Sequence, residues 1–137
     1  MKVMGRRTLL FLLFGLPCLR AGGAGDSMEG ELTKTAEGKP VLKTKDGRHI
    51  QLEGDHDTAG VVNDDRLKGS DLEVIGKLLS AHRFQIGPIH KKSMWVHRNG
   101  KRYMITYWCD LCSIRNYTPG KCQCCQEETE LSLQEER

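Results

Sequence analysis

The 137-residue sequence lacks the short motifs that mark the familiar enzyme classes. It contains no Gly-x-Ser-x-Gly nucleophile elbow, no P-loop, no His-Glu-x-x-His pair and no dinucleotide fingerprint. A haem-attachment motif is also absent, because Ser113, and not a histidine, follows the pair Cys109 and Cys112. These absences favour a non-enzymatic protein and leave only an unfamiliar enzyme open.

The sequence also lacks an apolar run long enough to cross a membrane. Its longest run, residues 9–16, falls far short of the roughly 20 residues that a membrane-spanning helix needs. Basic residues precede this run and small residues follow it, which is the pattern of a secretory signal peptide over residues 1–24. The pair Arg6-Arg7 leaves twin-arginine export open beside the general pathway. We therefore expect an exported protein of the periplasm or cell surface, with no transmembrane helix in its mature chain.

An excess of positive charge is missing once the signal peptide is set aside. The whole chain has 21 Lys and Arg against 18 Asp and Glu. Four of the basic residues and none of the acidic ones lie in residues 1–24, which leaves 17 against 18. Bulk charge therefore gives no reason to expect nucleic-acid binding.

Alternating apolar residues and turn signals predict a mostly β fold. Residues 41–45 and 48–52 flank Asp46-Gly47, and residues 94–98 and 101–108 flank Asn99-Gly100. Both dipeptides suit the positive φ angles of a type I′ hairpin turn. With further strands near residues 72–76 and 84–86 and one short helix within 58–67, the pattern favours a small OB-like or SH3-like barrel.

The mature chain is the size of one domain. We assign residues 25–125 to a single β-rich domain that opens with a short flexible lead, residues 25–30. A cysteine-rich loop, residues 109–125, closes that domain. Residues 126–137 are rich in glutamate and form an acidic tail.

Five cysteines in this loop are the strongest chemical signal in the sequence. Cys109 and Cys112 follow a predicted strand, and a Pro-Gly turn at 119–120 separates them from Cys122, Cys124 and Cys125. Two turns that face each other can complete a tetrahedral thiolate shell. We expect Cys109, Cys112, Cys122 and either Cys124 or Cys125 as ligands, with the second pair spaced as C-x-C or adjacent rather than as the C-x2-C of a zinc ribbon. Sulfur ligands favour a soft metal, with zinc first and an iron–sulfur cluster or copper as alternatives.

Two other uses of the cysteines remain open. Exported domains often oxidise their cysteines into a disulfide framework, but five thiols cannot all pair within one chain. A thiol–disulfide redox protein that uses Cys109 and Cys112 is the second alternative. The 25 residues that follow Cys112 leave no room for the remaining helices and strands of a thioredoxin fold, which disfavours that fold.

A histidine and a basic stretch supply further candidates. His90 is a possible extra metal ligand, although a lone histidine more often serves as a structural hydrogen-bonding residue. Residues 77–102 contain seven Lys or Arg, three His and no acid. They predict either a solvated face or a surface for an anionic partner, such as an envelope polymer or an acidic envelope protein. The candidate anion-binding residues are Lys91, Lys92, Arg98, Lys101 and Arg102.

Residues 107–126 resemble a signature of small exported bacterial proteins, such as those of acidobacteria, most of which are uncharacterised. The shared pattern is Y-W-C-D-x-C-x-I-R-x-Y-T-P-G-x-C-x-C-C-Q. The likeness extends to Gly54-Asp55, Arg66-Leu67, residues 69–71 and residues 88–90, and so covers most of the mature domain. It implies a shared domain with the cysteines as its motif, and it implies no particular activity.

Overall fold

The computed structural model describes residues 25–88 and 90–137. The predicted signal peptide, residues 1–24, lies outside the described residues. Strands dominate the described part of the chain. No helix in that part is long and apolar enough to cross a membrane.

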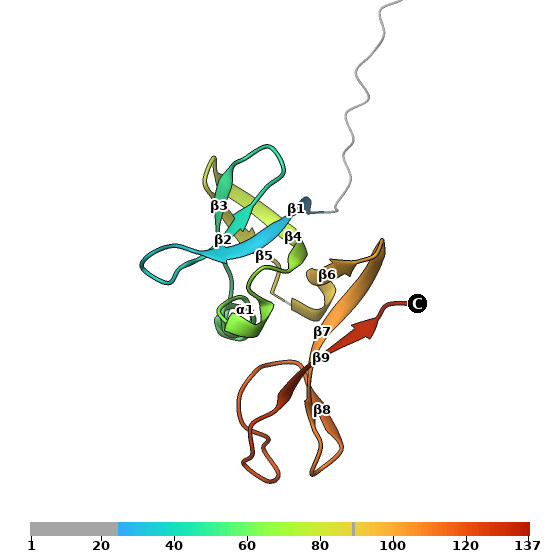
Figure 1. Cartoon of the computed structure of the whole chain (residues 1–137). Helices are drawn as coiled ribbons and strands as arrows, with labels where there is room; N and C mark the ends of the chain where they lie inside the picture. The colour runs from blue at the N-terminus through green and yellow to red at the C-terminus, as the bar shows by residue number, and fades with distance from the viewer. Residues whose placement is uncertain (1–24, 89) are drawn as a thin grey trace, which may run out of the picture.

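Five strands close into a small barrel (Figure 1). In chain order they are β1 (Asp26–Lys34), β2 (Pro40–Lys43), β3 (His49–Glu53), β4 (Asp71–Ser80) and β5 (Arg83–Ile86). The sheet order is β1-β2-β3-β5-β4, and β1 closes the ring by pairing β4 through its first half and β2 through its second. Only the β3–β5 pair is parallel within this ring. With one helix between β3 and β4, this is the OB-like arrangement that the sequence predicted.

That helix, α1 (His56–Val62), lies beside the barrel and begins at a well-defined cap. The carboxylate of Asp55 accepts the backbone N–H of Thr58 at 2.9 Å, which satisfies one of the free donors at the helix start. Val61 and Val62 are buried and join the core. A 3-10 turn, η1 (Asp65–Leu67), follows and buries Leu67.

The core is a single cluster of buried side chains from the barrel strands, α1, η1 and the strands that follow the barrel. The members with less than 2% exposure include Phe84, Leu32, Leu42, Ile50, Leu72, Met94, Ile105 and Tyr107. Ile105 and Tyr107 come from outside the ring of five strands, so the extension is packed onto the barrel and not merely attached to it.

Past the barrel the sheet continues into an extension. A 3-10 turn, η2 (His90–Lys92), leads into β6 (Met94–Arg98) and β7 (Lys101–Cys109), which are followed by β8 (Ile114–Asn116) and β9 (Glu130–Glu135). β6 pairs with the first half of β4 and with the first half of β7. β8 pairs with the second half of β7, on the same edge as β6. β9 pairs with the other edge of β7. Figure 1 shows the loops around β8 at the far end from the hairpins of the barrel.

The two predicted hairpins are confirmed, but their turns differ. Asn99 and Gly100 both have positive φ, 51° and 75°, as a type I′ turn requires. In the first hairpin Gly47, with φ 85°, is the only residue of the Asp-Gly pair in that region. The N–H of Gly47 donates to the carbonyl of Thr44, so this is a longer loop closed by one left-handed glycine, and the expected type I′ turn is wrong.

Two segments differ from the sequence expectation. The expected flexible lead, residues 25–30, belongs mostly to β1, where Met28, Gly30 and Leu32 alternate inward. Within the acidic segment 126–137, Glu130–Glu135 forms β9, and its Leu131 and Leu133 pack against the core. The inward face of β1 is interrupted by a glycine, and that of β9 carries only two leucines. The alternation of apolar and polar residues is therefore too weak in both segments to predict a strand from the sequence.

The close pairing of β4 and β5 at Gly76 allows a test of the strand order in the barrel. A Cβ at Gly76 would lie 1.9 Å from the backbone carbonyl oxygen of Gln85, so the two strands would have to separate. We expect Gly76→Ala to lower the free energy of unfolding by about 2 to 3 kcal/mol. The neighbouring exposed Lys77→Ala should change it by less than about 0.5 kcal/mol. Urea denaturation of both variants measures the difference, and equal stabilities would contradict this strand pairing.

Candidate metal centre

The first half of the cysteine cluster is a tight turn at the end of β7. Cys109 is the last residue of β7 and pairs with Ile114 of β8. Between them the chain reverses, and Ser113 takes a positive φ of 54° to return it into β8. The backbone N–H groups of Leu111 and Cys112 point at the sulfur of Cys109. This turn therefore presents Cys109 and Cys112 on one side while its amides surround the first sulfur.

The second half repeats the same local geometry. The N–H groups of Cys124 and Cys125 point at the sulfur of Cys122. Gln126 takes a positive φ of 64°, as Ser113 does after the first pair. The expectation that this group departs from zinc-ribbon spacing is wrong, because Cys122 and Cys125 are themselves a C-x2-C pair with Cys124 inside it. The overlapping cysteine hides this spacing in the sequence.

The sulfur atoms of four cysteines lie close together. The Sγ atoms of Cys109, Cys112, Cys122 and Cys125 all lie within 4.8 Å of one another. Cys109 Sγ and Cys125 Sγ are 3.5 Å apart. A zinc ion with Zn–S bonds of about 2.3 Å in a tetrahedron sets its sulfurs about 3.8 Å apart. The cluster therefore has the donor type, number and spacing that a single tetrahedral ion needs.

The four sulfurs are not equally enclosed. Cys109 and Cys122, which receive the backbone N–H groups, are 2% and 1% exposed. Cys112 and Cys125, the second members of each pair, are half-buried. The centre thus has a closed side toward β7 and an accessible side at the surface.

The thiol pKa values follow from this arrangement. Backbone N–H groups of Cys125 and Cys124 lower the pKa of Cys122 to about 7, because they stabilise its thiolate. The Cys112 N–H lowers the pKa of Cys109, but burial and the neighbouring thiols outweigh it and leave that pKa raised. The Cys124 thiol and then burial raise the pKa of Cys112. Four thiolates at this spacing would repel one another unless a cation lay between them. One thiolate among three neutral thiols is stable without a cation.

Cys124 and His90 lie outside the group of four. Cys124 is exposed, with its thiol next to that of Cys112. His90 is 7% exposed, and its Nε2 lies 2.5 Å from the backbone carbonyl oxygen of Tyr117. Because a carbonyl can only accept, this nitrogen carries the proton and donates. His90 therefore ties the loop of the cluster to η2, which is the structural role that the sequence analysis weighed against metal ligation.

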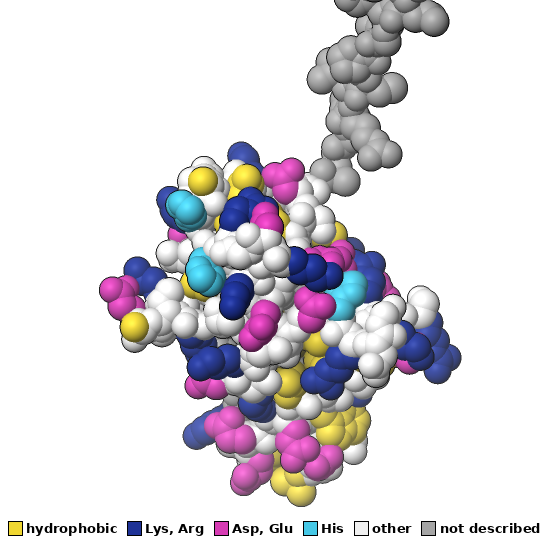
Figure 2. Space-filling view, turned by 45° about the horizontal axis from the view of Figure 1, so that its top comes forward, with side chains coloured by type: hydrophobic (Ala, Val, Ile, Leu, Met, Phe, Trp, Pro, Cys, Tyr) yellow, Lys and Arg dark blue, Asp and Glu magenta, His cyan; other side chains and the backbone are white. Residues whose placement is uncertain are grey.

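Two of the five candidate anion-binding residues, Lys101 and Arg102, are held in ion pairs. Lys101 pairs with Glu135 at 3.1 Å, and Arg102 pairs with Glu73 at 3.1 Å and with Glu136 at 3.5 Å. The Arg102 guanidinium also stacks 3.8 Å from the Trp95 ring centroid, and the Lys91 ammonium lies 4.3 Å from that of Tyr117. Lys92 and Arg98 are exposed. On the face in Figure 2, cationic and anionic side chains are intermingled, which fits a solvated face.

A second group of possible ligands lies where β1, β4 and β6 pair side by side. Glu29, Glu73 and His97 bring one ligand atom each within 4.8 Å of the others. His97 Nε2 is 2.6 Å from Glu73 Oε2, and the Arg102 guanidinium occupies the same carboxylate. Since a fixed cation already neutralises Glu73, this group is better explained as an ion-pair network. No sequence pattern reveals this group, because its members meet only when β1, β4 and β6 pair.

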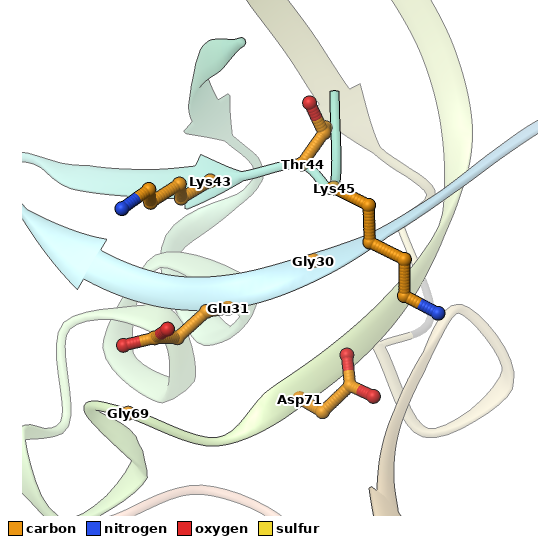
Figure 3. A pocket seen from close by; sticks show the side chains of 7 residues that line it. All are labelled: Gly30, Glu31, Lys43, Thr44, Lys45, Gly69 and Asp71. Atoms are coloured by element: carbon orange, nitrogen blue, oxygen red, sulfur yellow. The ribbon is translucent and has the colours of Figure 1, made fainter. Parts of the chain in front are cut away.

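An open pocket on the barrel has mixed charge. One open pocket of about 390 Å³ lies between β1, the end of β2 and the approach to β4 (Figure 3). Lys45 and Asp71 extend into the same space there, with Lys43 and Glu31 nearby. These charges alternate in sign and converge on no common point, so the pocket favours no particular ligand.

A clamp of charged side chains joins the cysteine lobe, residues 109–129, to the barrel. Arg66 of η1 donates to the backbone carbonyl of Thr129 at 2.8 Å, and its guanidinium lies 5.3 Å from the Tyr107 ring centroid. Asp64, whose side chain is 7% exposed, holds that guanidinium at 2.9 Å. Burial alone would raise the pKa of Asp64, but hydrogen bonds from the Arg66 side chain and backbone outweigh it and lower that pKa.

This clamp predicts a pH-dependent stability. A carboxyl whose pKa is lowered on folding stabilises the protein above its unfolded pKa and stops doing so as the pH falls through its folded pKa. We expect Asp64→Asn to cost about 1 kcal/mol at pH 7 and almost nothing at pH 2. Asp65→Asn, whose side chain is 84% exposed, is the matched control and should cost less at pH 7. Denaturation at both pH values tests this, and a loss from Asp64→Asn that is equal at pH 2 and pH 7 would contradict it.

Comparisons with protein-family models, with curated proteins and with solved structures each found no match to this chain. A function for it must therefore follow from what its own residues can bind. Four cysteines that can hold a metal ion are the clearest such feature in the described residues.

Proposed function

We propose that this chain is an exported, non-enzymatic protein that binds one soft metal ion, zinc in the first place, through Cys109, Cys112, Cys122 and Cys125. The observation that carries the proposal is the convergence of these four sulfurs within 4.8 Å from two turns of the same geometry. Thiolate ligands select zinc, copper(I) or iron and disfavour magnesium and calcium.

The spacing of the sulfurs favours a single ion over an iron–sulfur cluster. In a cluster, two or four irons and their bridging sulfides stand between the cysteine sulfurs. Sulfurs that are all within 4.8 Å of one another leave room for one ion at their centre. Zinc suits this shell best because it prefers four ligands in a tetrahedron and has no redox chemistry of its own.

Four protein ligands also argue against catalysis at the metal. Catalytic zinc sites keep one position open for water or substrate, whereas structural sites are closed by four side chains. The absence of enzyme motifs in the sequence agrees with a closed site.

Export is part of the same proposal. The apolar run and small residues of 1–24 have the pattern of a cleaved signal. The first described strand, β1, begins at Asp26, directly after the expected cleavage zone. In an oxidising compartment a bound metal would also keep closely spaced thiols from forming mixed disulfides.

Metal content is the first prediction. After expression of the full chain with export and purification without chelator, we expect about one equivalent of zinc per chain and cleavage after residue 23 or 24. Cys109→Ser should abolish the metal, because the sulfur it removes is buried in the centre. The matched control Cys124→Ser removes a thiol from the same loop and should keep it.

Elemental analysis, a thiol count after denaturation and intact mass measure these outcomes. Five reactive thiols in the mature chain agree with a metal thiolate centre. A metal-free protein with one free thiol would instead mean two disulfides, and it would overturn the metal proposal.

Metal removal is the second prediction. We expect a chelator to raise amide hydrogen exchange in residues 109–129 by about tenfold or more, because the proposed ion joins the two cysteine turns of this lobe to each other. The barrel strands β1 to β5 should keep their protection, since their core contains none of the cysteines. Mass spectrometry of the exchanged peptides distinguishes the two regions. Equal loss in both would show that the metal also supports the barrel.

A further inference from the structure

The cluster contains one thiol more than a tetrahedral ion needs, and its position is specific. Cys124 stands inside the second C-x2-C pair, between Cys122 and Cys125. Its backbone N–H points at Cys122, as part of the shell of the centre, but its side chain is exposed. The Cys124 thiol is adjacent to Cys112 and not to the closed side of the site.

The ligand next to it, Cys112, is one of the two ligands at the accessible side of the centre. Cys112 is half-buried, whereas Cys109 and Cys122 are almost fully buried. Leu111, directly before Cys112, is 75% exposed, so the described chain leaves this side of the centre open to solvent. An incoming sulfur ligand can therefore reach the metal on the side where Cys112 and Cys124 lie, and not past the buried Cys109 and Cys122.

We propose that Cys124 is an exchange ligand that takes the place of Cys112 on the metal and so makes the ion transferable to a thiol-bearing metal acceptor. This inference rests on the proposed function. It changes the centre from a purely structural ion to one that can be loaded and unloaded.

The step balances without any redox partner. The Cys124 sulfur forms a bond to zinc while the bond from zinc to the Cys112 sulfur breaks. The proton that leaves the Cys124 thiol is taken up by the released Cys112 thiolate, directly or through water. Zinc remains divalent, the number of thiolates on it stays at four, and the ion now sits on the exposed side, where an acceptor's thiolates can displace the remaining ligands in turn.

The test uses the full chain, expressed with export and loaded with one equivalent of zinc, and measures transfer of that zinc to a coloured chelator by stopped flow. We expect Cys124→Ser to slow the transfer by about tenfold or more, while its zinc stoichiometry and affinity stay as in the unaltered protein. Gln123→Ser is the matched control, because it alters an exposed side chain of the same turn and should transfer at the unaltered rate.

A second measurement examines the substitution of ligands directly. If Cys124 can occupy the Cys112 position, Cys112→Ser keeps about one equivalent of zinc with weakened affinity, and Cys112→Ser with Cys124→Ser loses it. Unchanged transfer in Cys124→Ser, or complete loss of zinc from Cys112→Ser alone, overturns the exchange role and leaves the metal centre standing. Failure of the unaltered protein to bind zinc overturns the proposed function itself, so the two failures are distinguishable.

Discussion

Strand β7 connects the two parts of this molecule through a single register. Its alternate residues Ile105, Tyr107 and Cys109 are all buried on one face, the first two in the core and the third in the cysteine cluster. A strand that slips by one residue turns every side chain to the opposite face. Packing of the barrel core therefore fixes the direction in which the Cys109 sulfur points. β6, β8 and β9 then hold β7 on both of its edges, so this position cannot shift without breaking the sheet.

The remaining supports of the lobe come from the segments that cap the barrel. Arg66 of η1 holds the carbonyl of Thr129, and His90 of η2 holds that of Tyr117. These contacts fasten the lobe on either side of the second cysteine pair, which no strand of the barrel carries. The second pair thus depends on polar contacts where the first depends on sheet pairing. This difference explains why we expect the lobe to need a metal ion for its closure. The barrel is not expected to need one.

The sequence was informative where local chemistry is strong. The Asn-Gly hairpin, the mostly β barrel and the gathering of cysteines were all visible in it, because turn residues and sulfur ligands act over a few positions. It was silent where distant strands decide the outcome. β1 was missed because Gly30 interrupts its apolar alternation, and β9 because Leu131 and Leu133 lie among glutamates. The C-x2-C spacing of Cys122 and Cys125 is hidden by Cys124, and only the convergence of the four sulfurs separates Cys125 from its neighbour.

The asymmetry of the centre follows from the same backbone. In each turn the first cysteine receives the N–H groups of the residues after it, which requires the chain to wrap around that sulfur and bury it. The second cysteine closes the turn and is left at its rim, where Cys112 and Cys125 are half-buried. A site built from two such turns must therefore have two firmly held sulfurs and two accessible ones. Since the Cys124 thiol lies beside Cys112 on the accessible side, the proposed exchange of ligands would take place there, and not on the side where Cys109 and Cys122 are buried.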